Sequence, residues 1–394
     1  MPEAQPSLAA LFARFLRFGL LAWGGPVAQI AMIKRELVEE EQWLTPERFN
    51  RMLAVYQVLP GPEAHELCVH LGMMKRGRLG GILAGVGFML PGLLLILALA
   101  WMYQRLDIDR PEIAAIFLGV QIGVIALIVR AVHRIGEHVL TDKWLWAVGI
   151  GSAIASFVGF SFWIILPVAG ISYAALAARR FALTAVIALI GLGAAIWFTG
   201  PTEGLARSAA SPLVEHGAVG ALALFVSGLK AGLLTFGGAY TAIPFVRNDA
   251  FGRGWITEGQ FLDGLALGGV IPAPLIIFAT FVGYLAGGLG GALAITAGIF
   301  LPAFSFALLF YDRLERVIED ERLHRLLEGI AAGVVGLIAV TALQLGWNVS
   351  QNLPSPIVGA AIFAASLAVL YLWKSKLTVL AVVLGSAAAG ALAF

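Results

Sequence analysis

The chain has 394 residues, of which 60% are hydrophobic and only 13% are charged, and its mean hydropathy is +0.89. A soluble domain is about 45–50% apolar and about 25% charged, so this composition excludes a soluble enzyme and indicates a membrane protein. The 26 basic and 24 acidic residues give a formal net charge of +2, which provides no basis for binding nucleic acid. The single cysteine, Cys68, excludes an intramolecular disulfide and any cysteine-based metal cluster.

Apolar stretches long enough to cross a bilayer occupy most of the chain, and they predict helices because they lack the alternation of barrel strands. In the first part of the chain, spans are expected at 11–34, 51–74, 79–102 and 113–129, as a pair of short helices within 144–178, and at 181–202. In the second part they are expected at 225–246 and 261–285, in the rest of the charge-free run 264–311, and at 329–373 and 377–394. Together these stretches predict about thirteen spans.

An internal repeat divides the chain into two parts. Residues 12–25 match residues 225–238 at one offset, which places Gly24-Gly25 opposite Gly237-Gly238. With small gaps, Trp43, Thr45, Phe49, Pro60, Pro62 and Gly72 then match Trp255, Thr257, Phe261, Pro272, Pro274 and Gly283. Such a repeat predicts an N-terminal repeat over 1–180, a joining helix and loop over 181–216, and a C-terminal repeat over 217–394.

Basic residues in equivalent loops suggest that the two repeats have opposite orientations. The loop at 75–78 contains three basic residues, whereas its equivalent at 284–291 is uncharged, and the next pair of loops reverses this bias. The positive-inside rule then predicts two inverted halves of about six spans each plus a joining helix, with a cytoplasmic N-terminus and a periplasmic C-terminus. The basic residues of the 34–51 loop oppose this assignment.

Four helix breaks near the middle of spans form the first candidate site, because broken helices in repeats are typical of transporter substrate sites. They are Gly24-Gly25-Pro26, Pro60-Gly61-Pro62, Gly237-Gly238 and Pro272-Ala273-Pro274. Each Pro-x-Pro stops a helix and restarts it. The restarted helices should offer free amides at Glu63, Ala64 and His65, and at Leu275, Ile276 and Ile277. Such amides favour an anion; the alternative is a set of proline kinks satisfied by neighbouring helices.

Two cations support an anionic substrate. Arg17 aligns with Lys230, and each lies seven residues before its Gly-Gly pair. A cation inside a span costs about 2.5–3.5 kcal/mol, so such groups usually face a cavity or a partner. The alternative is that both side chains reach the headgroup layer.

The most polar segment inside a span is 62–70, which contains the proton-coupling candidates Glu63, His65, Glu66 and His70. The two histidines are five residues apart and cannot share a metal ion as an i, i+4 pair does, so no metal site is expected. Glu66 and His70 are four apart and can meet on one helix face. They could carry a proton together or form a structural hydrogen-bonded pair.

At these residues the sequence resembles a long-chain, two-domain member of the chromate ion transporter family. The resemblance rests on Gly24-Gly25-Pro26, Leu59-Pro60-Gly61-Pro62, Thr235-Phe236-Gly237-Gly238-Ala239-Tyr240 and Thr280-Phe281-Val282-Gly283-Tyr284. It implies two oppositely oriented halves, no prosthetic group, and export of chromate across the bacterial inner membrane, which confers chromate resistance. The chain departs from the family at Ala273, where many members have glycine.

The resulting hypothesis is a secondary transporter, not an enzyme, for chromate or a sulfate-like oxyanion, with the lipid bilayer as its environment and a homodimer allowed. The expected substrate-binding residues are Arg17, Gly24, Gly25, Pro26, Pro60, Gly61, Pro62, Lys230, Gly237, Gly238, Pro272 and Pro274. A sulfate or other anion carrier that handles chromate by mimicry, an intramembrane enzyme and a purely structural membrane protein remain as alternatives.

Overall fold

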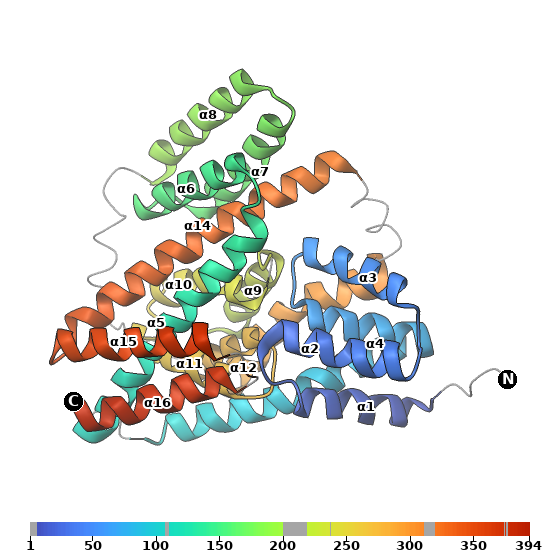
Figure 1. Ribbon diagram of the computed structural model, residues 1–394, viewed down its shortest axis with the longest axis horizontal. Coiled ribbons are helices and arrows are strands. Elements are labelled where there is room, and N and C mark those ends of the chain that lie inside the picture. Colours follow the sequence, from blue (N-terminus) through green and yellow to red (C-terminus); the bar gives the residue numbers. More distant parts are fainter. Residues whose placement is uncertain are drawn as a thin grey trace.

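The computed structural model describes residues 6–106, 110–199, 219–236, 238–310, 320–373, 375 and 377–394. All secondary structure in these residues is helical, as expected from the composition. In Figure 1 the first and last helices, α1 and α16, lie toward opposite ends of the long axis, and α14 crosses the molecule diagonally above them.

We call the residues before α8 the first half and those after it the second half. The first half contains α1 (Leu8–Leu20), α2 (Gly25–Lys34), the π-helix η1 (Arg35–Glu40), α3 (Pro46–Val58), α4 (Glu63–Tyr103), α5 (Pro111–Val139), α6 (Lys143–Phe157) and α7 (Phe162–Ala177), followed by α8 (Phe181–Thr199). The second half contains α9 (Ala221–Leu233), η3 (Ala239–Ala242), α10 (Ile243–Gly252), α11 (Glu258–Val270), η4 (Leu275–Ile277), α12 (Phe278–Ser305), η5 (Phe306–Phe310), α14 (Glu321–Gln351), α15 (Pro356–Leu372) and α16 (Thr378–Ala393).

Among the described residues, four helical stretches have the length and the apolar composition to cross a membrane: Glu63–Tyr103, Pro111–Val139, Leu275–Phe310 and Glu321–Gln351. Shorter apolar helices accompany them, including α7, α9, α15 and α16. The hairpin expected within 144–178 is present as α6 and α7. The protein is therefore membrane-embedded, and its lipid-facing surface explains the many large apolar side chains that are exposed.

One long helix in each half, α4 and α12, folds back on itself at a glycine. In α4, Arg76 (φ −140°, ψ 29°) and Gly77 (φ 63°, ψ −164°) are non-helical, and in α12 the same conformations occur at Gly287 (φ −144°, ψ 21°) and Gly288 (φ 62°, ψ −156°). A methyl group added at Gly72 would lie 2.4 Å from the Cβ of Ala84. In a straight helix twelve residues span about 18 Å, so this contact requires a reversal at the positive-φ glycine.

Each fold-back packs on the first helix of its own half through a backbone contact at glycine. A methyl group added at Gly19 of α1 would lie 2.4 Å from the carbonyl oxygen of Phe88, and one at Gly232 of α9 would lie 2.4 Å from that of Ile299. These glycines are the equivalent positions of the sequence repeat. The same close helix contact therefore occurs twice in the chain.

The last helices of each half pack on the long helix of the other half. α6 and α7 of the first half contact α14, and α15 and α16 of the second half contact α5. Glycines allow this close approach too: a methyl group at Gly390 of α16 would lie 2.4 Å from the carbonyl oxygen of Ala115 on α5. The two halves are interlocked, which holds their central breaks against each other.

Two glycines of α16 provide a matched test of this packing. Gly390→Ala forces α16 and α5 apart and should lower the free energy of unfolding by about 1–3 kcal/mol. Gly385, on the same helix, has no atom within 4 Å of an added methyl group. Gly385→Ala should raise the free energy of unfolding by about 0.4–1 kcal/mol. Thermal and denaturant unfolding of the purified variants in detergent would check both signs, and equal effects would refute the interlocked packing.

Candidate substrate site at the helix breaks

The structure contains all four expected interruptions. They lie at 21–24 between α1 and α2, at 59–62 between α3 and α4, at 234–236 and 238 before η3, and at 271–274 between α11 and η4. Positive φ angles at Gly24 (88°), Gly25 (76°), Gly61 (151°) and Gly238 (118°) explain why glycine is needed there. Gly237 lies outside the described residues. Pro26, Pro62 and Pro274 stand at or directly before helix starts, where a missing amide hydrogen costs nothing.

Hydrogen bonds join each break of the first half to one of the second half. The amide of Gly61 donates to the carbonyl oxygen of Thr235 over 2.8 Å. Across the other pair, Nε2 of Gln29 donates to the carbonyl oxygens of Ala22 (2.9 Å) and Ala273 (3.2 Å). The structure thus brings the Pro-x-Pro break of one half against the glycine break of the other, twice.

Sequence reasoning missed Gln29, which is buried on α2. The available signal was its position as the one polar residue between Gly25 and Lys34. A buried polar side chain in an apolar helix needs a partner, and here the partners are two backbone carbonyls freed by the breaks. Gln29 therefore satisfies the backbone of both halves with one amide group.

The restarted helices offer fewer free amides than expected. The amide of His65 donates to the carbonyl oxygen of Pro62 over 2.8 Å, and that of Ile277 donates to the carbonyl oxygen of Pro274 over 3.0 Å. The prediction was therefore wrong for these two residues, because a tight first turn satisfies them. Within the described residues, the amides of Glu63 and Ala64 have no acceptor and remain at the N-terminus of α4.

Both candidate cations are paired with an acid nineteen residues further along the chain. Arg17 contacts Glu36 on η1, and Lys230 contacts Asp249 on α10. The Arg17 side chain is 56% exposed, whereas that of Lys230 is only 12% exposed. The two halves thus contain matching ion pairs, but only the Lys230–Asp249 pair is enclosed by the protein.

Lys230 lines a polar cavity of about 590 Å³, together with residues from α10, α14 and the loop between α6 and α7. Its ammonium group lies 5.2 Å from the centre of the Phe162 ring. In the same cavity Arg247 contacts Glu258 and donates to Oε1 of Gln344 over 2.8 Å. Sequence reasoning identified neither Arg247 nor Glu258 as a site residue.

Charged groups around this cavity keep unused hydrogen-bonding capacity. Nε of Arg247, Oδ2 of Asp249 and Oε2 of Glu258 are buried, and none of them has a hydrogen-bond partner in the described part of the chain. Buried polar atoms in proteins are usually hydrogen-bonded, either to other protein atoms or to a bound polar molecule. The arrangement is able to hold a polar solute.

The polar segment of α4 does not form the expected Glu66–His70 pair. Nδ1 of His70 is 2.7 Å from the hydroxyl of Tyr56, and neither carboxyl oxygen of Glu66 has a hydrogen-bond partner among the described residues. His65 is fully buried, with its ring 4.9 Å from that of Phe300 and 4.8 Å from that of Phe304. His65, Glu66 and His70 therefore have different surroundings.

Glu66 lies against the break itself. A methyl group added at Gly61 would be 2.7 Å from Oε1 of Glu66, so glycine leaves the space that the carboxyl group occupies. In the second half the equivalent of Gly61 is Ala273. Because the alignment of the repeat has a one-residue gap in this region, Glu66 corresponds to Ile277 or Phe278, and both are apolar. The departure from the family pattern at Ala273 thus accompanies the loss of the carboxyl group.

A second buried carboxylate, Asp263 of α11, was also missed. It accepts hydrogen bonds from the hydroxyl of Tyr103 (2.6 Å) and from Nε2 of Gln121 (3.0 Å), and so links α11 to α4 and α5. In the described residues no group of three His, Cys, Asp or Glu side chains is placed to hold a metal ion.

Comparison with known proteins gives a consistent result. The chain matches the family described as Chromate transporter over residues 9–198 and again over 222–391. It is 60% identical to a chromate transport protein of Pseudomonas aeruginosa, with 100% of this chain and 94% of the relative covered. No solved structure gives a significant match.

More distant relatives carry similar descriptions. A probable chromate transport protein of Synechococcus elongatus is 28% identical, with 90% of this chain and 88% of the relative aligned. A chromate transport protein of Cupriavidus metallidurans is 29% identical, with 98% and 94% aligned. All three relatives are described as transport proteins and not as enzymes.

A double-mutant cycle tests the fit between Gly61 and Glu66. Gly61→Ala should lower the free energy of unfolding by about 1–3 kcal/mol, since it strains a positive-φ backbone and collides with the carboxyl group. Glu66→Ala removes the collision but not the backbone strain, so the double variant should recover part of the loss. Unfolding in detergent would measure this, and strictly additive effects would show that the two residues do not interact.

Proposed function

This chain belongs to the chromate transporter family, and from that premise we propose that it is a secondary transporter that carries chromate, a tetrahedral dianion, across the bilayer. The observation that carries the proposal is the hydrogen-bonded contact of helix breaks from both halves, at Gly61 with Thr235 and at Gln29 with Ala273. Broken helices in contact at a repeat interface are typical of transporter substrate sites.

We assign oxyanion binding to the breaks. The free amides of Glu63 and Ala64 stand at the positive end of the α4 dipole, which favours an anion. The substrate-binding residues proposed are Arg17, Gly24, Gly25, Pro26, Pro60, Gly61, Pro62, Lys230, Gly237, Gly238, Pro272 and Pro274. Of these, Lys230 lines the polar cavity, and we propose that chromate passes through that cavity.

We further propose two inverted halves, 1–180 and 217–394, joined through 181–216. The recurrence of the glycine fold-backs at Gly77 and Gly288 and of the ion pairs at Arg17 and Lys230 supports the repeat. Rocking between such halves would expose the breaks to each side in turn. The chain would lie in the bacterial inner membrane, with its N-terminus in the cytoplasm and its C-terminus in the periplasm.

Export is the direction that the membrane potential favours. Moving a dianion out of a negative interior releases about 2 × 2.3 kcal/mol per 100 mV when no other charge moves with it. Export would confer chromate resistance. Coupling to protons is proposed for Glu63, His65, Glu66 and His70, with Glu66 foremost, because a charge on this buried carboxyl group would be unpaired.

Transport by inside-out membrane vesicles tests the function. Energised vesicles that contain the protein should accumulate chromate above the level in protein-free vesicles, and excess sulfate should compete because it has the same shape and charge. Chromate accumulation is also measured with a protonophore present and the membrane potential clamped, and a change in accumulation would indicate proton coupling. Accumulation of sulfate but not of chromate would identify a sulfate carrier, and no accumulation of either would contradict the proposal.

Removal of Lys230 tests the cation assignment. Lys230→Gln should lower the initial rate about tenfold or more, since a hydrogen bond to a charged group contributes about 1.5–3 kcal/mol. If Lys230 served only to neutralise Asp249, the double variant Lys230→Gln/Asp249→Asn would transport normally. We expect it to stay impaired.

Matched controls make this result specific. Arg14→Gln also removes a cation that is paired with an acid, Glu41, one turn before Arg17 on α1. It should leave the rate within about twofold, whereas Arg17→Gln should reduce it. Equal rates for Arg14→Gln, Arg17→Gln and the unmodified protein would show that Arg17 does not bind the substrate. Full recovery of the rate in the Lys230→Gln/Asp249→Asn double variant would show that Lys230 does not bind it either.

A further inference from the structure

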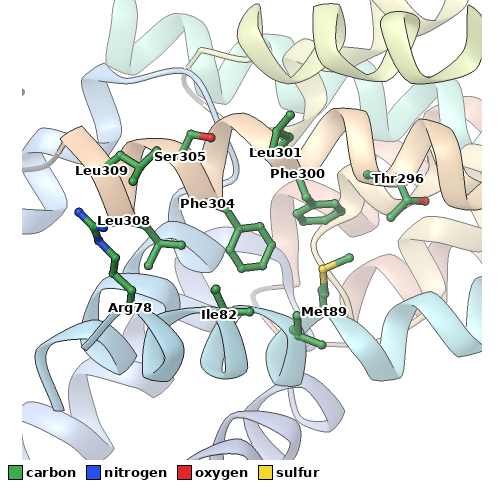
Figure 2. Close-up of a pocket in the computed structure, with 12 residues that line it drawn as sticks. Arg78, Ile82, Met89, Thr296, Phe300, Leu301, Phe304, Ser305, Leu308 and Leu309 are labelled. Atoms are coloured by element: carbon green, nitrogen blue, oxygen red, sulfur yellow. The ribbon is translucent and has the colours of Figure 1, made fainter. Parts of the chain in front are cut away.

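An apolar groove of about 550 Å³ lies between the two halves, and its lining residues are not those of the helix breaks. Figure 2 shows its walls: Ile82 and Met89 project from α4, and Phe300, Phe304 and Leu308 project from α12 and η5. Ile82 is 42% exposed and Leu309, at the open end, is 56% exposed. In a membrane protein such an open apolar groove faces lipid.

The groove matches one leaflet of a bilayer in length. From Arg78 to Met89 along α4 there are eleven residues, which span about 16 Å. The hydrocarbon core of a bilayer is about 30 Å thick, so one leaflet supplies chains of about 15 Å. A single acyl chain in an extended conformation would run along the groove from its open end to Met89.

Arg78 gives the groove a charged end. Its side chain is exposed, lies at the mouth beside Leu308 and Leu309 (Figure 2), and has no ion pair or hydrogen bond with any described residue. The neighbouring Lys75 is different, because its ammonium group lies 4.7 Å from the centre of the Trp43 ring. The position equivalent to Arg78 in the second half is Leu289, so the repeat does not require a cation here.

We propose that this groove binds one acyl chain of an anionic phospholipid, with the lipid phosphate against Arg78. A guanidinium group makes bidentate hydrogen bonds to phosphate, and basic residues at the membrane surface favour anionic lipid. A protein segment fits less well, since the groove walls offer almost no partner for a peptide backbone.

The bound acyl chain would be separated from His65 of the proposed site by two aromatic rings. Phe300 and Phe304 form the inner wall of the groove, and the same two rings cover the His65 ring near the break. The walls belong to α4 and α12, which come from different halves. A lipid held there becomes part of the interface between them.

Native mass spectrometry of the full-length protein, equilibrated with phosphatidylglycerol or phosphatidylcholine in detergent, tests this inference without any transport. The unmodified protein should retain one phosphatidylglycerol molecule in preference to phosphatidylcholine. Arg78→Gln should weaken that preference about fivefold, the factor expected for one basic residue at the membrane surface. Lys75→Gln, the matched loss of a nearby cation, should leave it unchanged.

A second pair of variants tests the groove itself. Ile82→Trp fills the groove at an exposed position and should abolish retention of either lipid, whereas Leu94→Trp, at an α4 position that is 59% exposed and outside the groove, should not. Unchanged preference in Arg78→Gln, an equal loss in Lys75→Gln, or full retention in Ile82→Trp would overturn the proposal. Failure of transport would leave these binding results unaffected, so the two proposals are separable.

Discussion

The backbone groups released by the helix breaks control the centre of this protein. Inside a bilayer an unpaired amide or carbonyl costs several kcal/mol, so a broken helix is stable only where another group satisfies it. Here each half satisfies the other: Gly61 donates to Thr235, and Gln29 donates to Ala22 and Ala273. The exchange of terminal helices, with α7 on α14 and α16 on α5, then keeps the breaks in register.

Most local features could be predicted from the sequence, because glycine and proline have strong backbone consequences. The breaks at Gly24-Gly25 and Pro60-Gly61-Pro62 and the short hairpin within 144–178 follow from such rules, and all are present. Long-range partners could not be predicted. The sequence places Glu66 and His70 on one helix face, but Tyr56, fourteen residues away, holds His70, and Gly61 accommodates Glu66.

The same limit applies to charges. Alignment of the repeat identified Arg17 and Lys230 but not their ion-pair partners. Glu36 and Asp249 are each nineteen residues away, and only the structure shows that they contact Arg17 and Lys230. Arg247 and Asp263 were missed for a related reason. Arg247 follows the span expected at 225–246, and Asp263 lies within the span expected at 261–285. Their hydrogen-bond partners Gln344, Tyr103 and Gln121 lie far along the chain on other helices, so the sequence does not show them.

In a transporter with inverted halves, sequence differences between the halves give the inward-facing and outward-facing states different energies. Two identical halves that exchanged conformations would produce inward-facing and outward-facing states of equal energy. This chain departs from identity at two sets of equivalent contacts: Gly61 with Glu66 corresponds to Ala273 beside apolar residues, and the exposed Arg17–Glu36 pair corresponds to the enclosed Lys230–Asp249 pair. Enclosed charges must exchange partners when a cavity opens, whereas exposed ones can exchange them for water at little cost. The two states would therefore differ in energy even without substrate, and the second half would resist opening more than the first.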